Sequence, residues 1–182
     1  MSKLSPKTHA IAKSLLLTHE GFKTTEYLCT AGYRTIGVGY NLDAHHGLPK
    51  GMTGKYINGK LTISENDVLS LFEISIDDHW TPLIKALPWV NQLDEWRQAA
   101  LLDMAFMGVE KLLKFKKMLG FLQSGRFAEA AVESLDSKWS HDVDNNIGDG
   151  KGRADTISMI IEKGELPTSI KQTYRIPDKE LS

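Results

Sequence analysis

The length, composition and charge of the chain exclude several classes of protein. Its 182 residues are 41% hydrophobic and 25% charged, which fits one globular domain or two small lobes that share a core. A formal net charge of −1 provides no overall basic field, so nucleic acid is not expected as a partner. The single cysteine, Cys29, excludes an intrachain disulfide and favours folding in a reducing compartment.

The sequence also lacks the signals that send a protein to or across a membrane. Its N-terminal residues contain no apolar stretch typical of a secretory signal, and no run of about 18 apolar residues occurs anywhere. We therefore expect the protein to accumulate in the cytoplasm of the cell that makes it.

A helix is predicted at the start of the chain. Ser5 and Pro6 have the pattern of an N-cap followed by a proline in the first turn, and apolar residues recur at helical spacing until Gly21. The carboxylate of Glu20 is thus expected at the C-terminal end of this helix.

Two β-hairpins are predicted next. β-branched and aromatic residues surround glycines over residues 27–40, which indicates a hairpin with its turn at Ala31-Gly32. The pair Asn58-Gly59 is a strong signal for a second short hairpin. The segment from Thr62 to Glu65 then has the pattern of a capping box that opens a helix.

The rest of the chain is predicted to be helical, ending in a tail. Glycines at 125 and 164 separate the helical segments, and residues 165–182 are polar with two prolines, which is typical of a loosely held tail. The predicted helices span residues 93–106, 112–122, 127–139 and 153–163.

Groups suited to glycoside hydrolysis gather in the first forty residues. Such a reaction needs a protonated carboxylic acid for the leaving oxygen and a second group that handles water on the opposite face of the sugar. Glu20 can be the acid, and the hairpin can bring Cys29 and Thr35 toward it. The same residues also fit a solvated surface charge and a small core side chain, so their types alone leave the role open.

At these positions the chain resembles the phage-type lysozymes, glycoside hydrolase family 24. The resemblance is strongest in His19-Glu20-Gly21, Tyr27 and the segment from Gly32 to Tyr40, and it continues weakly over most of residues 5–164. That family carries a Glu, eight intervening residues, an Asp, five intervening residues and a Thr. Glu20, Cys29 and Thr35 have this spacing.

The resemblance implies a fold, an activity and a partner. The expected fold is α+β and mainly helical, with a small lobe over about residues 20–62 and a larger lobe over about 63–164 that includes the N-terminal helix. The cleft between the lobes would hold the glycan strand. The expected enzyme is a monomeric endolysin that cleaves the β-1,4 bond between N-acetylmuramic acid and N-acetylglucosamine in peptidoglycan, reaches the wall with a holin, and uses no metal or cofactor.

The residue at the family's Asp position departs from the pattern. Cys29 occupies it, as a cysteine does in some members of the family. An ordinary thiol has a pKa near ~8.5 and is mostly neutral at pH 7, whereas an aspartate there would be charged. Cys29 could act as a small thiolate population, as a thiolate favoured by its surroundings, or as a polar contact for the water.

The resemblance also implies contacts with the substrate. Tyr40 and Asn41 are expected to make them after the hairpin, and Phe106 and Arg153 in the helical part. Met107 stands where related enzymes often carry Asn or Gln, which weakens the match there.

Other functions remain open at this point. A lytic transglycosylase would need only Glu20, and a disarmed relative would bind glycan without cutting it. A Cys/His peptidase would pair Cys29 with a remote histidine such as His79, although a hairpin lacks the helix N-terminus that activates a thiol. His45 and His46 lack the paired spacing of zinc ligands, so a polar loop is the preferred interpretation.

Overall fold

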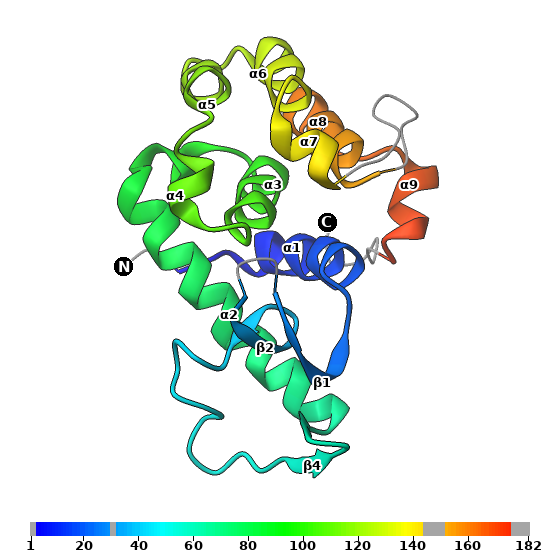
Figure 1. Ribbon diagram of the computed structural model, residues 1–182. Helices are drawn as coiled ribbons and strands as arrows, with labels where there is room; N and C mark the ends of the chain where they lie inside the picture. Colours follow the sequence, from blue (N-terminus) through cyan, green and yellow to red (C-terminus); the bar gives the residue numbers. More distant parts are fainter. Residues whose placement is uncertain (1–2, 30–31, 144–151, 176–182) are drawn as a thin grey trace. The chain divides into compact units, whose positions relative to one another are not determined.

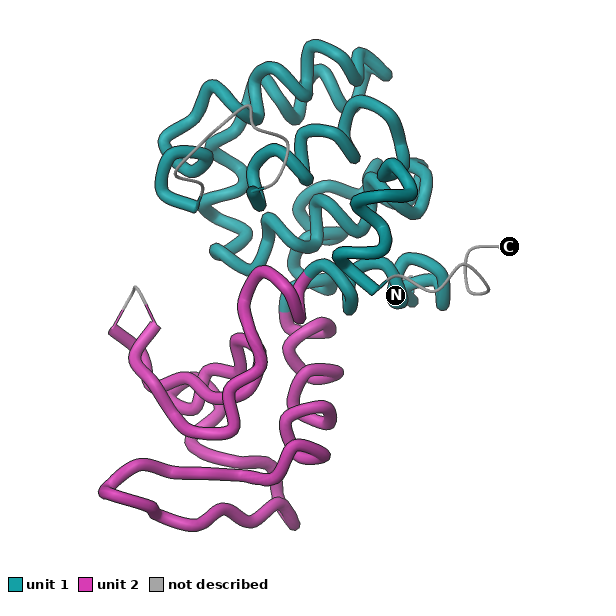
Figure 2. The backbone as a smooth tube through the Cα atoms, turned by 90° about the vertical axis from the view of Figure 1, so that its right-hand side faces the viewer, with its two compact units in different colours: residues 1–15, 79–182 teal, residues 16–78 magenta. Residues whose placement is uncertain are grey.

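The computed structural model describes residues 3–29, 32–143 and 152–175, and the chain divides into two compact units. Unit 2 comprises residues 16–78 and carries the β-sheet, whereas unit 1 comprises residues 1–15 and 79–182 and is helical in its described part (Figures 1 and 2). The predicted class, α+β and mainly helical, is confirmed.

The first helix, α1 (Pro6–His19), begins and ends as predicted. The hydroxyl of Ser5 accepts a hydrogen bond from the amide of Thr8 at 3.0 Å, which satisfies one of the unpaired N–H groups of the first turn. Gly21 ends the helix with a φ of +77°, a left-handed conformation that favours glycine. Glu20 therefore lies directly after the last helical residue, and its amide still donates to the carbonyl of Leu16 at 2.8 Å.

Unit 2 contains an antiparallel five-stranded sheet with the strand order β3-β2-β1-β5-β4. Both predicted hairpins form. The second turns at Asn58 (φ +50°) and Gly59 (φ +76°), the left-handed pair that a two-residue hairpin loop requires. Ala31, in the predicted turn of the first hairpin, lies outside the described residues. The strands are β1 (Lys23–Leu28), β2 (Arg34–Gly37), β3 (Tyr40–Asn41), β4 (Lys55–Ile57) and β5 (Lys60–Thr62).

The helix that follows the sheet, α2 (Glu65–Ala86), starts with a different capping box from the one predicted. The hydroxyl of Ser64 accepts from the amide of Asp67 at 3.1 Å, and the amide of Ser64 donates to the carboxylate of Asp67 at 3.3 Å. Thr62 pairs within β5 and is not available as a cap. The box is therefore Ser64 with Asp67, two residues later than the sequence pattern indicated.

Unit 2 extends further along the chain than the small lobe expected from the sequence. It ends at Asp78, within α2, instead of near residue 62. Val68 of α2 lies against β2, because a Cβ atom added to Gly37 would stand 3.6 Å from its Cγ1 atom. Val68, Leu71 and Phe72 are fully buried, so the first turns of α2 belong to the core of unit 2.

In unit 1, two predicted helices are each interrupted. The 112–122 segment breaks at Phe115, which has a non-helical ψ of 52°. The 127–139 segment breaks at Asp136, and the hydroxyl of Ser137 then accepts from the amide of Ser140 at 3.1 Å and caps a new helix. The remaining elements are η1 (Pro88–Gln92), α3 (Glu95–Ala105), α4 (Val109–Leu112), α5 (Lys116–Gln123), α6 (Phe127–Leu135), α7 (Lys138–Val143), α8 (Arg153–Lys163) and α9 (Thr168–Thr173).

The predicted loose tail is wrong for residues 165–175. Leu166 and Tyr174 are buried, and the phenol of Tyr174 shares a buried hydrogen bond of 3.0 Å with the hydroxyl of Thr156 in α8. Burial of Leu166, before α9, and of Tyr174, after it, thus holds this segment within unit 1 despite its polar composition. Residues 176–182 lie outside the described residues. None of the described helices is long and apolar enough to cross a membrane.

Candidate functional site

Three residues predicted to be catalytic, Glu20, Cys29 and Thr35, lie in unit 2. Glu20 follows the last residue of α1, Cys29 follows the last residue of β1, and Thr35 is the second residue of β2. Glu20 and Cys29 are partly exposed, whereas Thr35 is only 3% exposed. The helix end and the hairpin therefore present two accessible groups beside one buried hydroxyl.

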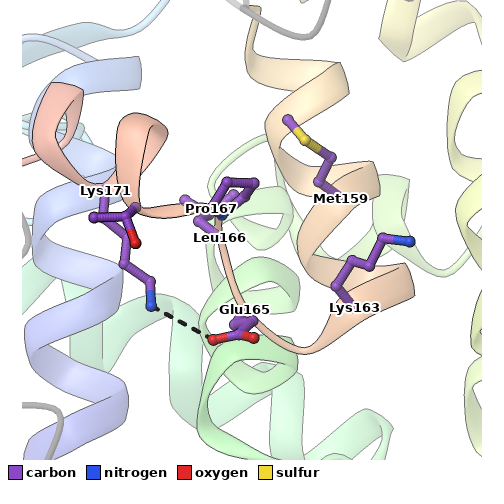
Figure 3. Close-up of a pocket in the computed structure, with 7 residues that line it drawn as sticks. Met159, Lys163, Glu165, Leu166, Pro167 and Lys171 are labelled. Atoms are coloured by element: carbon purple, nitrogen blue, oxygen red, sulfur yellow. Dashed lines mark hydrogen bonds and ion pairs between the residues drawn. The ribbon is translucent and has the colours of Figure 1, made fainter.

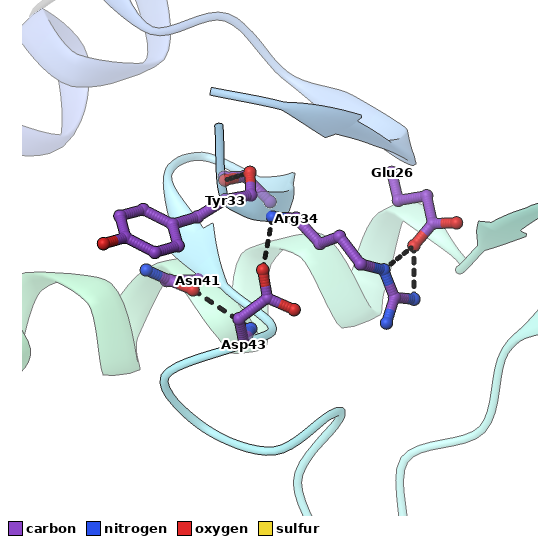
Figure 4. Close-up of polar contacts among 6 residues, drawn as sticks. Glu26, Tyr33, Arg34, Asn41 and Asp43 are labelled. Atoms are coloured by element: carbon purple, nitrogen blue, oxygen red, sulfur yellow. Dashed lines mark hydrogen bonds and ion pairs between the residues drawn. The ribbon is translucent and has the colours of Figure 1, made fainter. Parts of the chain in front are cut away.

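One backbone carbonyl, that of Tyr33, joins Cys29 to Thr35. It accepts a hydrogen bond from the amide of Cys29 at 3.0 Å and another from the hydroxyl of Thr35 at 3.0 Å. Figure 4 shows Tyr33 next to Arg34, the first residue of β2. Because its only proton is directed to this carbonyl, the hydroxyl oxygen of Thr35 can interact with a further group only as an acceptor.

Tyr27 connects this hairpin to Glu20. In the β1–β2 register Tyr27 is the partner of Thr35. Burial raises the pKa of the Tyr27 phenol, the negative charges that Glu20 and Cys29 carry when ionised raise it further, and a hydrogen bond with the backbone of Gly39 opposes them. Tyr27 thus stands close enough to both groups to sense their charges.

The ring and the hydroxyl of Tyr27 are both held in place. The ammonium of Lys23 lies 4.0 Å from the centre of the ring, a cation–π contact. Gly39, which bonds the phenol, has a φ of +81°, where a side chain would be strained. The sequence interpretation included Tyr27 only as part of the family motif. The predicted hairpin register could have identified it as the partner of Thr35.

Tyr40 and Asn41, predicted to contact substrate, organise the turn after β3. Tyr40 is 2% exposed, and its hydroxyl donates to the carbonyl of Gly47 at 3.2 Å. The side-chain oxygen of Asn41 accepts from the amide of Asp43 at 3.0 Å (Figure 4) and from the amide of Ala44 at 3.0 Å. Both side chains therefore stabilise this turn, and their contact with substrate stays a prediction.

Arg34 ties the edge of this hairpin together. Its amide donates to the carboxylate of Asp43 at 2.7 Å, and its guanidinium forms an ion pair with Glu26 at 2.7 Å (Figure 4). Partial burial raises the pKa of Glu26, but the hydrogen bond and charge of Arg34, with help from Leu61 and Lys60, hold it below its ordinary value overall. Glu26 is therefore a charged structural carboxylate and a poor proton donor at neutral pH.

The other two predicted contact residues, Phe106 and Arg153, belong to unit 1. The ring of Phe106 stacks on His79 with a centroid distance of 4.1 Å. The guanidinium of Arg153 donates to the carboxylate of Asp103 at 2.9 Å and to its carbonyl at 3.0 Å, and Asp103 is fully buried. Arg153 therefore compensates a buried charge, and its contact with substrate stays a prediction.

The histidines weighed as zinc ligands have other surroundings. The Nε2 atom of His45 lies 2.7 Å from the carboxylate of Asp78, and its ring stacks on Tyr40 with centroids 4.5 Å apart. Within residues 3–29, 32–143 and 152–175, no three His, Cys, Asp or Glu side chains are arranged to hold a metal ion.

A pocket of about 230 Å³ lies elsewhere, between α8 and α9 (Figure 3). Lys171 and Glu165 form an ion pair of 3.5 Å at its wall. None of the residues predicted for catalysis or substrate contact lines it, so it is not part of the candidate site. Its lining residues are Met159, Lys163, Glu165, Leu166, Pro167, Thr168 and Lys171.

Comparison with known proteins identifies similar sequences over most of the chain. A family model described as Phage lysozyme matches residues 17–154, a range that includes Glu20, Cys29 and Thr35. Probable T4-type lysozyme 1 of Dictyostelium discoideum is 30% identical over 172 residues, which cover 85% of this chain and 95% of that protein. Probable T4-type lysozyme 2 of the same organism is 30% identical over 169 residues, with the same coverage of both chains.

A phage structural protein is also similar. The pre-baseplate central spike protein Gp5 of Enterobacteria phage T4 is 30% identical over 181 residues, which cover 92% of this chain and 30% of that protein. Similar sequences thus make up nearly all of one relative and about a third of another.

The position of Tyr27 predicts a measurable coupling to Glu20. Glu20→Gln removes a negative charge, so the pKa of Tyr27 should fall toward its ordinary value while staying raised, because burial is the largest cause of the shift. Carbon NMR of labelled tyrosine, assigned with Tyr27→Phe, would measure it. Glu65→Gln, at an exposed carboxylate of the same unit, is the matched control. Equal titration of Tyr27 in wild type and Glu20→Gln would contradict this arrangement.

Proposed function

Because this chain belongs to the phage lysozyme family, we propose that it hydrolyses the β-1,4 bond between N-acetylmuramic acid and N-acetylglucosamine in bacterial peptidoglycan. Membership of this family supports a lysozyme-like function, the hydrolysis of peptidoglycan. The observation that carries the finer proposal is the geometry of the β1–β2 hairpin, in which the carbonyl of Tyr33 accepts from both Cys29 and Thr35 and Tyr27 is paired with Thr35.

In this proposal Glu20 is the general acid. Its carboxylic proton passes to the glycosidic oxygen as the bond from that oxygen to the anomeric carbon breaks, and an oxocarbenium-like sugar develops. Water then adds to the anomeric carbon from the opposite face and releases a proton to the solvent, from which Glu20 regains the proton that it gave to the leaving oxygen. The reaction consumes one water and leaves a new reducing end. Glu26 is a poorer candidate because its carboxylate is engaged by Arg34.

We assign the water-positioning role to Thr35 and Cys29. The hydroxyl of Thr35 donates to the carbonyl of Tyr33, so its oxygen is left to accept a hydrogen bond from the attacking water. An acceptor in that place directs a lone pair of the water toward the sugar. Cys29, anchored by its amide to the same carbonyl, would contribute its sulfur as a second acceptor, most strongly when ionised.

Four further residues were predicted to contact the substrate. Tyr40 and Asn41 would act indirectly, by fixing the turn that follows β3. For Phe106 and Arg153 we retain the glycan contact that the family resemblance implies; in the structure the ring of Phe106 stacks on His79 and the guanidinium of Arg153 is bonded to Asp103.

For the biological role, we propose an endolysin that stays in the cytoplasm of the host cell as a monomer until a holin permeabilises the membrane. Membership of the phage lysozyme family motivates this proposal. Expression alone in a Gram-negative cell should then leave the culture intact, and co-expression of a holin should lyse it. Rapid lysis without the holin would contradict this role.

A lytic transglycosylase is the second candidate. The observation that favours it is the thiol of Cys29 at the position where the family carries a carboxylate, because such an enzyme needs only the acid. The C6 hydroxyl of the muramic acid then replaces water as the nucleophile and leaves an anhydro end.

The first functional prediction concerns Glu20. Glu20→Gln should retain the fold, because the amide keeps the shape of the side chain, and should lower kcat on purified peptidoglycan by about 10²- to 10⁴-fold, because no acidic proton remains. Circular dichroism and thermal unfolding would verify the fold. Glu65→Gln should hydrolyse at the wild-type rate. Wild-type turnover by Glu20→Gln at equal folded concentration would refute the assignment.

The second functional prediction concerns Cys29. If the thiolate orients the water, Cys29→Asp should stay active and reach full rate at a lower pH, because an ordinary aspartate is charged from about pH 5 upward and an ordinary thiol only near ~8.5. Cys29→Ala should lose most activity. Initial rates across a pH series measure both effects. Superimposable profiles of Cys29→Ala and wild type would remove Cys29 from the mechanism and favour the single-acid transglycosylase.

A further inference from the structure

The β4–β5 hairpin is a basic part of an otherwise acidic chain. Residues 44–64 include three lysines and no aspartate or glutamate, although the whole chain has a net charge of −1. The remainder of the chain is therefore net negative. Positive charge with no acidic side chain in the same segment would favour contact with an anionic surface even though the protein as a whole is not basic. The three lysines are Lys50, Lys55 and Lys60.

The register of the hairpin sorts its side chains onto two faces. Ile57 pairs with Lys60 and Lys55 pairs with Thr62, so Lys55, Ile57 and Lys60 share one face. Tyr56 pairs with Leu61 and lies on the opposite face, where its phenol interacts with Arg34. On this face Lys55 stands two residues before Ile57 on β4, and Lys60 stands opposite Ile57 on β5.

This face is open to solvent in the described structure. Ile57 is 53% exposed, and Lys55 and Lys60 are exposed. β4 is also an edge strand of the sheet (Figure 1). The charge of Lys60 acts on Glu26, but that carboxylate already forms its ion pair with Arg34. Exposure of the apolar side chain of Ile57 to water is unfavourable. Contact with a partner would remove this surface from water and so lower the free energy.

We propose that the face of the β4–β5 hairpin formed by Lys55, Ile57 and Lys60 binds the surface of an anionic membrane. Lysine stems run along apolar material while their ammonium groups reach lipid phosphates, and Ile57 enters the interface between them. A soluble polyanion such as an acidic wall polymer offers charge but no apolar layer for Ile57. Each lysine near such a surface is worth about 1 kcal/mol, which corresponds to about fivefold in binding.

The proposal can be tested with the full-length protein and lipid vesicles. Wild type should sediment with phosphatidylcholine vesicles that contain phosphatidylglycerol, should not sediment with pure phosphatidylcholine, and should be released by added NaCl. The double variant Lys55→Gln/Lys60→Gln should bind on the order of 25-fold more weakly, from two lysines at about fivefold each. Ile57→Ser should weaken binding severalfold without a change in charge.

The matched control is Lys111→Gln/Lys114→Gln, which removes two exposed lysines from unit 1. It should bind like wild type, and all variants should keep wild-type unfolding temperatures. Three results would overturn the proposal: no sedimentation with anionic vesicles, equal loss of binding in the control pair, or hairpin variants that lose binding to purified peptidoglycan while vesicle binding is unchanged. None of these results depends on whether the protein hydrolyses peptidoglycan.

Discussion

The antiparallel register of β1 and β2 is the constraint on which the candidate site depends. It sets Tyr27 opposite Thr35 and directs the amide of Cys29 and the hydroxyl of Thr35 to the same carbonyl, that of Tyr33. A slip of one residue would turn every side chain of β2 to the other face of the sheet. Arg34 opposes such a slip, because its amide is bound to Asp43 and its guanidinium to Glu26.

This arrangement also explains how a cysteine can stand where the family carries an aspartate. The amide of Cys29 is held by the hairpin, so the backbone at this position is fixed by a bond that does not involve the side chain. A carboxylate there would be ionised at neutral pH, whereas a thiol contributes a full charge only when it ionises. The same backbone bond is open to either residue, whereas the pH at which the side chain becomes charged differs.

Much of the fold could be predicted from the sequence where local signals were strong. Asn58-Gly59 specifies its turn by backbone conformation, and the helix over residues 153–163 agrees with α8 at both ends. Predictions were wrong where tertiary contacts or competing caps decide the outcome. Ser64 replaces Thr62 as the cap because Thr62 pairs in β5, and buried Tyr174 holds a segment whose composition is typical of a tail.

The site was predicted less completely. Spacing and family resemblance identified Glu20, Cys29 and Thr35, but a backbone carbonyl such as that of Tyr33 has no sequence signature. The pairing of Tyr27 with Thr35 requires the strand register, and the contact of His45 with Asp78 joins residues far apart in the chain. These features depend on three-dimensional structure and could not be found from composition or periodicity.

The central claim is that this protein hydrolyses the glycan strand with water, and the chemical nature of its products tests that claim most directly. Purified peptidoglycan should be digested with the wild-type protein and the fragments identified by mass spectrometry. Hydrolysis predicts muropeptides that end in a reducing N-acetylmuramic acid, with one water added for each bond cut. Fragments ending in anhydromuramic acid, each lighter by one water, or new amines without new reducing ends, would contradict it.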